Sequence, residues 1–181
     1  MSGRTSGGPA GGERRRQLVE IAYHLIAERG FEGLRTRTVA ERAGINQATL
    51  HYHFPTKDDL VRGVVDYLIE QYSSPHAAYD PLTASPLDLV RAEFLSVTQL
   101  AGNPHLIIVL DELALHALRD PVVADLLNTM DAGWHAYMAA LLRRGIAAGE
   151  MRPDLDADDA ARLVLTAIKG LRVEILRKDP A

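Results

Sequence analysis

The stretch Thr38-Val-Ala-Glu-Arg-Ala-Gly-Ile-Asn-Gln-Ala-Thr-Leu50 decides the fold, because it has the spacing of a helix-turn-helix. Small Ala40 allows two helices to approach closely, and Gly44 tolerates the tight turn between them. The apolar residues predicted to form the shared core are Val39, Ala43, Ile45 and Leu50. On these residues alone, an ordinary helical hairpin with a solvated face remains an alternative to a DNA-binding motif.

Helices are predicted on both sides of this stretch. An amphipathic helix follows Glu13 and ends at Gly30, which can supply a left-handed C-terminal cap. Within the stretch, a short helix covers about residues 37–43, and a second begins at Gln47 and must end before Pro55. Gly149 is predicted to end a long helix near the C-terminus.

Polar residues mark the starts of most of the predicted helices. Asn46 and Thr56 can each accept a hydrogen bond from an otherwise unpaired backbone N–H of a first turn. The same role is expected for Asp156. Three further helices begin with a polar residue followed by proline, at Ser85-Pro86, Asn103-Pro104 and Asp120-Pro121.

Composition favours an all-α protein. The 181 residues are 47% hydrophobic but 6% aromatic, there is no strand-like alternation, and no apolar run reaches the length of a membrane span. The absence of cysteine excludes disulfides and thiolate chemistry and fits a cytoplasmic protein. We expect a flexible tail at 1–12, a helix-turn-helix domain at 13–57 and a second helical domain at 58–181, joined by a helix at 57–73.

Charge is unevenly distributed along the chain. The formal net charge is −4. Residues 1–57 hold nine Lys and Arg against five Asp and Glu, a net of +4, and the remainder holds eleven against nineteen, a net of −8. The basic part contains the helix-turn-helix, so the overall acidity does not exclude a nucleic-acid partner.

The stretch from Thr49 to Leu60, Thr-Leu-His-Tyr-His-Phe-Pro-Thr-Lys-Asp-Asp-Leu, closely resembles the recognition helix and following turn of TetR-family repressors. The pair Gly30-Phe31 resembles the end of the first helix in that family, and residues 149–156 resemble its C-terminal region. The resemblance implies a three-helix DNA-binding domain, followed by a helical ligand-binding and dimerisation domain, with about nine helices in all.

The resemblance also implies which residues touch DNA. The expected contacts are Thr36, Arg37, Thr38, Gln47, Ala48, Thr49, His51, Tyr52, His53 and Lys57. The amide of Gln47 suits adenine N6 and N7, Ala48 suits a thymine methyl, and Lys57 suits a phosphate. His51 departs from the family pattern, which usually places an aromatic residue there, and this leaves the base read at that position open.

A homodimer, an operator and an effector are further expectations from the resemblance. The last two helices should pair across a two-fold axis through Trp134, Tyr137, Leu141, Val164, Ile168 and Leu171. An apolar effector pocket could be lined by Phe94, Thr98, His105, Leu110, Leu113, His116, Met130, Trp134 and Met138. We therefore expect a repressor that a small, mostly apolar molecule releases from palindromic double-stranded DNA, with no cofactor, metal, membrane or enzymatic activity.

Two other classes stay open at this point. A helical protein-interaction module without DNA binding would have the same composition. A metal protein could use His105, Asp111, Glu112 and His116 on one helix, although their spacing is not that of a known zinc motif.

Overall fold

The computed structural model describes residues 9–73, 84–99 and 103–178, and within these ranges the chain is helical without strands. Its eight α-helices and one short 3-10 helix, η1, are α1 (Pro9–Arg29), η1 (Phe31–Gly33), α2 (Thr36–Arg42), α3 (Gln47–His53), α4 (Lys57–Ser73), α5 (Pro86–Gln99), α6 (Pro104–Ala117), α7 (Pro121–Ala147) and α8 (Ala157–Lys178). The all-α architecture is confirmed, with eight α-helices in the described part where about nine were expected.

Helix α1 begins earlier than predicted. It starts at Pro9, whereas the sequence indicated a start after Glu13. The glycines at 11 and 12 suggested a flexible tail, but proline is well suited to the first turn of a helix because its missing N–H has no partner there. Residues 9–12, assigned to the tail, are therefore helical.

The helix-turn-helix forms as the spacing predicts. Gly44 has a φ of 66°, in the left-handed region that a tight turn requires. The Asn46 side chain then accepts the backbone N–H of Thr49 at 2.8 Å and caps α3. Val39 and Leu50 are fully buried, so α2 and α3 share one core.

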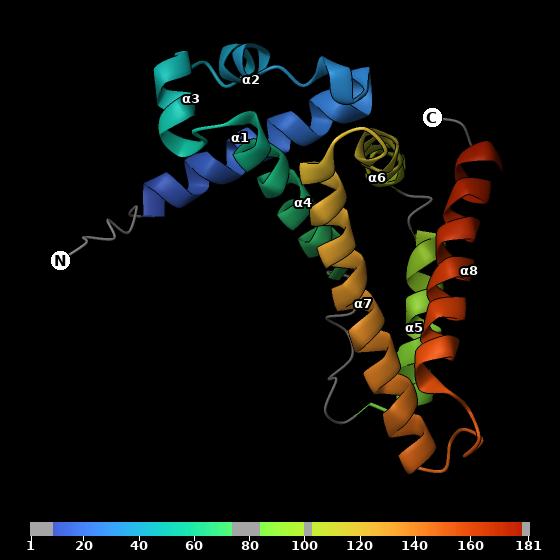
Figure 1. The fold of residues 1–181 in the computed structure, drawn as a ribbon. Helices are drawn as coiled ribbons and strands as arrows, with labels where there is room; N and C mark the ends of the chain where they lie inside the picture. Colours follow the sequence, from blue (N-terminus) through green and yellow to red (C-terminus); the bar gives the residue numbers. More distant parts are fainter. Residues whose placement is uncertain (1–8, 74–83, 100–102, 179–181) are drawn as a thin grey trace.

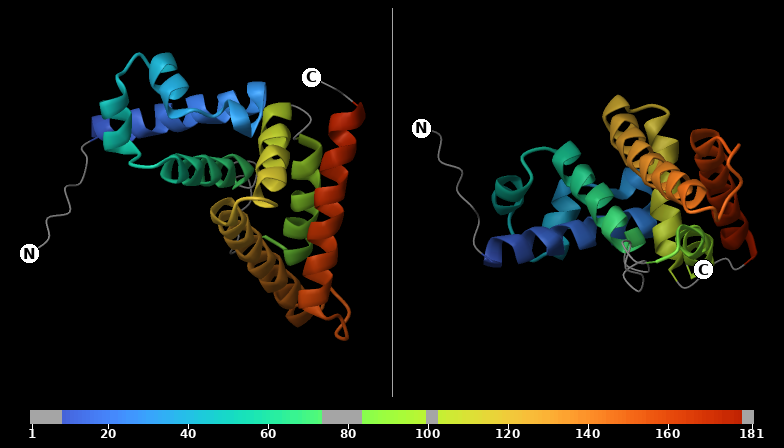
Figure 2. Two further views of the ribbon diagram at one scale, coloured as in Figure 1. Left: turned by 45° about the horizontal axis from the view of Figure 1, so that its top comes forward. Right: turned by 90° about the horizontal axis from the view of Figure 1, so that it is seen from below.

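Helix α4 starts with a reciprocal pair of caps. The Thr56 hydroxyl accepts the backbone N–H of Asp59 at 3.1 Å, and the Asp59 carboxylate accepts the backbone N–H of Thr56, also at 3.1 Å. This fixes the direction in which α4 leaves the recognition helix. Helices α1 and α4 lie side by side along the N-terminal part (Figure 2).

All three later helices start where the sequence predicts, at Pro86, Pro104 and Pro121, but a side-chain cap forms at only two of these described starts. At the start of α7, the Asp120 carboxylate accepts the N–H groups of Val122 and Val123. At the start of α5, the Ser85 hydroxyl donates to Glu150 Oε2, which also accepts the N–H of Leu87 at 3.1 Å. Asn103 makes no side-chain cap. Its amide oxygen instead accepts the Tyr23 hydroxyl from α1 at 3.5 Å, a partner 80 positions away that local spacing does not reveal.

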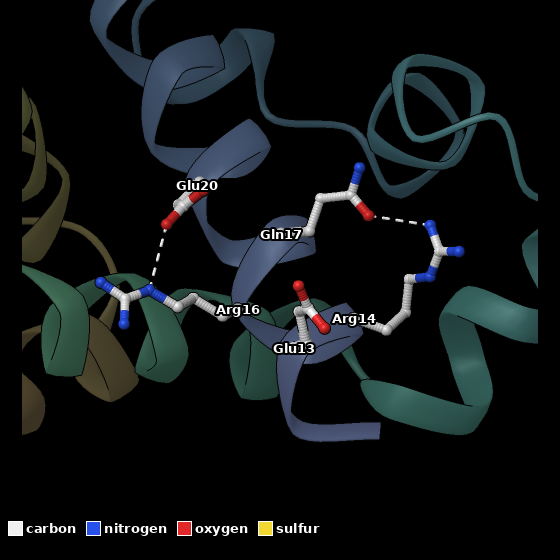
Figure 3. A pocket seen from close by; sticks show the side chains of 5 residues that line it. All are labelled: Glu13, Arg14, Arg16, Gln17 and Glu20. Atoms are coloured by element: carbon white, nitrogen blue, oxygen red, sulfur yellow. Dashed lines mark hydrogen bonds and ion pairs between the residues drawn. The ribbon is translucent and has the colours of Figure 1, made fainter. Parts of the chain in front are cut away.

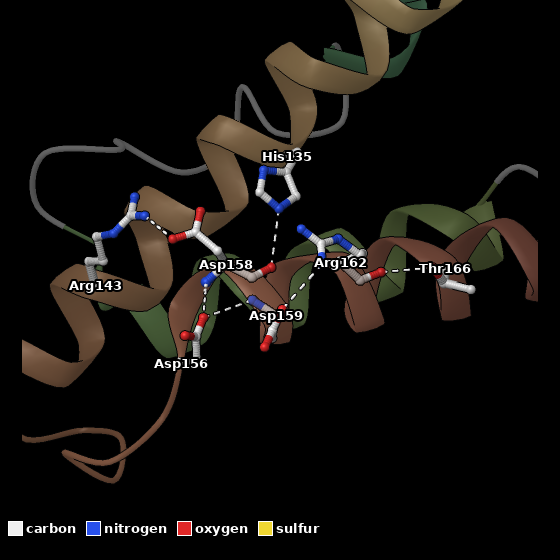
Figure 4. A network of polar contacts seen from close by, with 7 residues as sticks. All are labelled: His135, Arg143, Asp156, Asp158, Asp159, Arg162 and Thr166. Carbon is white, nitrogen blue, oxygen red and sulfur yellow. Dashed lines mark hydrogen bonds and ion pairs between the residues drawn. The ribbon is translucent and has the colours of Figure 1, made fainter.

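Helices α7 and α8 form the long part of the molecule, with α5 packed against both (Figure 1). Polar contacts hold α7 to α8: Arg143 pairs with Asp158, and His135 Nε2 lies 3.1 Å from the Asp158 carbonyl oxygen (Figure 4). Asp156 caps α8 through the N–H groups of Asp158 and Asp159. Lys169 of α8 also pairs with Asp131 of α7 at 2.6 Å, so polar contacts at two levels set the register of α7 against α8.

Two hydrophobic clusters form the core. The larger joins α1, η1, α2, α3, α4 and α6 to the start of α7 and to Ile168 of α8, and the smaller joins α5 to the end of α7 and to the first half of α8. Phe94, Trp134 and Val164 pack against both clusters. The larger cluster runs across the predicted boundary at 57, so the N-terminal helices share a core with α6. No helix in the described ranges is long and apolar enough to cross a membrane.

Replacing Asp120 by alanine should make stability at the start of α7 less dependent on pH. The N–H of Val123, followed by that of Val122, lowers the pKa of the Asp120 carboxyl. A lowered native pKa contributes stability above the unfolded value of about 4, and this contribution disappears as the pH falls through the native value.

We therefore expect Asp120→Ala to lower the free energy of unfolding at pH 7 and to approach the wild type near pH 3, measured by urea denaturation. Asp125→Ala, which removes an exposed carboxylate from the same helix, is the control. Equal losses for both variants at pH 7 would show that the cap contributes nothing.

Candidate nucleic-acid interface

One face of α3 is exposed and carries the predicted base-reading residues. Gln47, Ala48 and His51 are exposed, and Tyr52 is 81% exposed. This face lies at the end of the molecule opposite α8 (Figure 1). An exposed helix face of this kind fits the major groove of B-DNA.

The other face of α3 anchors it. Leu50 and Phe54 are fully buried in the larger cluster. Arg15 of α1 donates a hydrogen bond to the carbonyl oxygen of His53 at 3.0 Å, and its guanidinium carbon lies 4.2 Å from the centre of the Phe54 ring. A cation at the last carbonyls of a helix interacts favourably with the helix dipole. Arg15 therefore holds the end of the recognition helix. The sequence did not distinguish it from its neighbours Arg14 and Arg16.

The remaining predicted contacts flank this face. Thr36 and Thr38 are half-buried at the start of α2, and Arg37 pairs with Glu41 at 2.8 Å. The Thr49 hydroxyl donates to the Asn46 oxygen at 3.0 Å, so donation to a phosphate would require this bond to open. The half-buried His53 ring contacts Tyr52 edge-on.

Lys57 contacts an aromatic ring as well as solvent. It is exposed at the start of α4, and its Nζ lies 4.5 Å from the centre of the Phe31 ring. That ring is also stacked on His116 of α6, with 3.6 Å between ring centres. The backbone N–H of Phe31 donates to Glu112 Oε2, also on α6, at 2.9 Å. The sequence did not predict this contact between α6 and the N-terminal helices.

The predicted effector residues divide into three groups. Phe94, Met130 and Trp134 are half-buried, and Leu110, Leu113 and Met138 are buried. His116 lies against Phe31, and the His105 ring contacts His24 of α1 edge-on, so both histidines face the N-terminal helices and not the space between α5 and α7. Their part in an effector pocket stays a prediction from the sequence. The side chain of Thr98 lies outside the described residues.

The predicted dimer residues also divide. Tyr137 and Leu171 are exposed and Trp134 and Val164 are half-buried. Leu141 and Ile168 are buried inside the protomer, where their apolar surface is already covered. A feature that the prediction missed is Leu163 on α8, which is 71% exposed.

A solvent-open groove of about 580 Å³ runs along α1 (Figure 3). It is lined by Glu13, Arg14, Arg16, Gln17 and Glu20. Two of its side-chain pairs hydrogen-bond to each other: Arg14 to Gln17 and Arg16 to Glu20. This groove is polar and lies outside the predicted effector region.

The residues of the metal alternative have other contacts. Glu112 and His116 contact Phe31, and His116 Nε2 lies 3.3 Å from Asp120 Oδ2. Among the residues that the structure describes, no three or more histidine or carboxylate side chains are placed to hold a metal ion.

The hairpin of α2 and α3 with its buried inner side, the exposed face of α3 and the attached helical domain define the class of helix-turn-helix DNA-binding regulators. Residues 18–64 match the model of the bacterial regulatory proteins of the tetR family, and residues 95–181 match the C-terminal model of BetI-type transcriptional repressors. The chain belongs to the TetR family of transcriptional regulators.

Known proteins share both sequence and fold with the chain. The transcriptional repressor KstR2 of Mycolicibacterium smegmatis is 28% identical over 152 residues, which cover 83% of this chain and 74% of the relative. A TetR regulator from Haloarcula marismortui superposes with a TM-score of 0.80 at 25% identity, over 93% of this chain and 88% of that one. A protein from Saccharomonospora viridis, solved in complex with choline, has a TM-score of 0.69 at 26% identity, over 94% and 88%.

The contact of Arg15 with α3 can be tested by a matched pair of substitutions. We expect Arg15→Met to lower the free energy of unfolding by about 0.5–1 kcal/mol, because it removes the cation over Phe54 and the bond to the end of α3. Arg14→Met removes the same charge from an exposed neighbour that bonds Gln17. Chemical denaturation that gives equal values for the two variants would contradict the anchoring role.

Proposed function

We propose that this protein represses transcription by binding a palindromic operator as a homodimer, and that a small-molecule effector releases it. The observation that carries the DNA-binding part is the exposed face of α3 held by a fully buried Leu50. Membership of the TetR family and the naming of KstR2 as a repressor support repression. Because its operator would lie on the chromosome, we place its action in the cytoplasm.

The proposed base contacts come from the exposed face and the backbone contacts from its edges. Gln47 pairs with a base, Ala48 and His51 lie over neighbouring bases, and Tyr52 lies beside the groove. Phosphates are bound by Lys57 and by the side chains at the edge of the face, Thr36, Arg37, Thr38, Thr49 and His53. One helix-turn-helix, here called a reading head, contacts few base pairs, so two reading heads on one duplex are needed for useful affinity.

The proposed dimer uses the outer faces of α7 and α8. On α7 the exposed residues at helical spacing are Gly133, Ala136, Tyr137 and Ala140. On α8 they are Leu163, Ala167, Gly170 and Leu171. Small residues alternate with apolar ones, which permits close approach of helices from a second copy in a four-helix arrangement. Trp134 and Val164 lie at the edge of these faces, whereas the buried Leu141 and Ile168 support them from inside.

The proposed effector site lies where the two hydrophobic clusters meet. Phe94 and Trp134 pack against both clusters, Met130 packs against the larger, and Met138 belongs to the smaller. A ligand between them would change how α5 and α7 pack and hence the spacing of the two reading heads. Leu110 and Leu113 of α6 belong to the larger cluster, and their packing would shift with such a change.

DNA recognition can be tested by selecting duplexes from a randomised pool and measuring affinity by fluorescence anisotropy. We expect enrichment of a palindrome. Gln47→Ala should weaken binding by about 1–3 kcal/mol and relax the sequence at one position per half-site. Lys57→Ala should weaken binding to all duplexes alike and reduce the dependence on salt.

Glu32→Ala, a change of an exposed residue in η1, serves as the control for general surface effects. If no sequence is enriched and the variants bind as the wild type does, the protein is not a sequence-specific DNA-binding protein. The helical interaction module would then be the better explanation.

The dimer face can be tested at Gly170. A Cβ added there meets no atom within 4 Å in the protomer, so Gly170→Leu should fold as well as the wild type. Across the proposed interface, leucine would force α8 and its symmetry mate apart. We expect monomers in sedimentation experiments and a loss of operator affinity of about 10²-fold or more, because the two heads no longer bind as one unit.

Gly12→Leu makes the same chemical change in α1, where an added Cβ also meets no atom within 4 Å. It should leave the dimer intact. A Gly170→Leu protein that remains dimeric would place the interface elsewhere.

A further inference from the structure

The ring of Phe31 is held in place by α6. The side chain is 5% exposed. One face of the ring is stacked on the imidazole of His116, with 3.6 Å between the ring centres and 22° between the ring planes. The backbone N–H of Phe31 donates to Glu112 Oε2 at 2.9 Å. Contacts with two side chains of α6 therefore fix both the position and the orientation of the ring.

The opposite face of this ring carries the ammonium of Lys57. Its Nζ lies over the ring, 4.5 Å from the ring centre. Because the stacked imidazole of His116 covers one face, the cation must lie on the other face. Aromatic faces attract cations through their quadrupole. Lys57 is otherwise exposed, at the start of α4 and four residues after the end of the recognition helix.

The stability of α4 does not explain a lysine at this position. The first turn of a helix lies at the positive end of its dipole, where carboxylates are favourable and cations are not. The next two residues, Asp58 and Asp59, follow this rule, whereas Lys57 does not. An anion at the same helix start would be attracted both by the dipole and by the ammonium. The lysine is therefore better suited to binding a phosphate than to stabilising its own helix.

We propose that Phe31 is a positioning residue for operator binding, which orders the Lys57 side chain on one face of its ring before a phosphate arrives. This inference rests on the phosphate contact of Lys57 in the proposed function. A lysine has a flexible four-carbon stem, and ordering such a stem on binding lowers affinity. The ammonium has three N–H donors, so the side that faces away from the ring remains available to phosphate oxygens.

The proposal gives two side chains of α6 a role in DNA binding. Glu112 and His116 hold the ring that holds Lys57, so both affect operator affinity without touching DNA. They act through Phe31 and are therefore positioning residues as well. The sequence placed Glu112 and His116 only in a metal site or an effector pocket.

The contact can be measured by NMR in the full chain without DNA. We expect a nuclear Overhauser effect between the Hε protons of Lys57 and the ring protons of Phe31. The ring current should also shift these Hε protons upfield, and Phe31→Leu should remove that shift. Absence of the Overhauser effect in the wild type would overturn the proposal.

The role in DNA binding can be measured by a double-mutant cycle on operator affinity. We expect Phe31→Leu to weaken binding by about threefold to tenfold, because Lys57 must then be ordered on binding. In the Lys57→Met background the same substitution should weaken binding by less than about twofold. Lys57→Met should lower the number of released counterions by about one, whereas Phe31→Leu keeps the charge and should leave the salt dependence unchanged.

Gln47→Ala is the matched control for this cycle, because it removes a proposed base contact of α3 and leaves the charge of Lys57 in place. A tilt of the whole reading head would disturb base and phosphate contacts together, so Phe31→Leu would then be non-additive with both substitutions. Positioning of Lys57 alone predicts the full loss from Phe31→Leu in the Gln47→Ala background.

Glu112→Ala is a second variant, which keeps the test decisive if urea denaturation shows that Phe31→Leu is not folded. It leaves the ring intact and removes the bond to the Phe31 N–H. We expect about twofold or more weaker operator binding when Lys57 is present, and no effect in the Lys57→Met background.

The proposal is wrong if either variant weakens binding equally with and without Lys57, or if the loss from Phe31→Leu disappears in the Gln47→Ala background. Failure of the proposed function gives a different result. In that case Lys57→Met binds the operator as the wild type does, with the same salt dependence, while the Overhauser effect still places the ammonium on the ring.

Discussion

Phe31 makes the densest set of contacts described between the N-terminal helices and α6, beside those of Tyr23 and His24. Its backbone N–H is bonded to Glu112, its ring is stacked on His116, and the ammonium of Lys57 lies over the same ring. Gly30 immediately before it has a φ of 70°, which lets the chain turn so that Phe31 reaches α6. Any displacement of α6 must therefore carry Phe31 with it or break these contacts, and either event alters the surroundings of a proposed phosphate-binding lysine.

The distribution of the core explains why such a displacement would be transmitted. A single hydrophobic cluster holds α1 to α4 and α6 together, and close-packed interiors respond to strain by shifting whole elements. Helix α5 belongs to the other cluster, and the two meet at Phe94, Trp134 and Val164. An effector between α5 and α7 would thus act where the clusters meet, next to the exposed faces proposed for the dimer.

Features that depend on near neighbours in the chain could be predicted from the sequence. Asn46, Thr56 and Asp156 cap their helices through residues two or three positions away, and Gly44 makes the turn that its spacing indicates. The exposed face of α3 followed from the inward position of Leu50.

Features that depend on distant partners could not be predicted. Asn103 is bonded to Tyr23 of α1, and the two histidines of α6 face α1 and η1. Leu141 and Ile168 resemble interface residues in the sequence because an apolar helix face does not reveal whether its partner is in the same chain. The burial of Glu93 likewise results from the packing of α5 on α7.

The separation of charge along the chain has a consequence for kinetics, since the +4 part carries the recognition helix at one end and the −8 part extends to the other. An uneven distribution of charge of this kind favours encounters in which the basic part faces the phosphates, because the field of DNA orients the molecule during diffusion. Repulsion between the acidic part and the phosphates would favour contact through the α3 end on non-specific DNA, and sliding along the duplex would then keep α3 beside the groove.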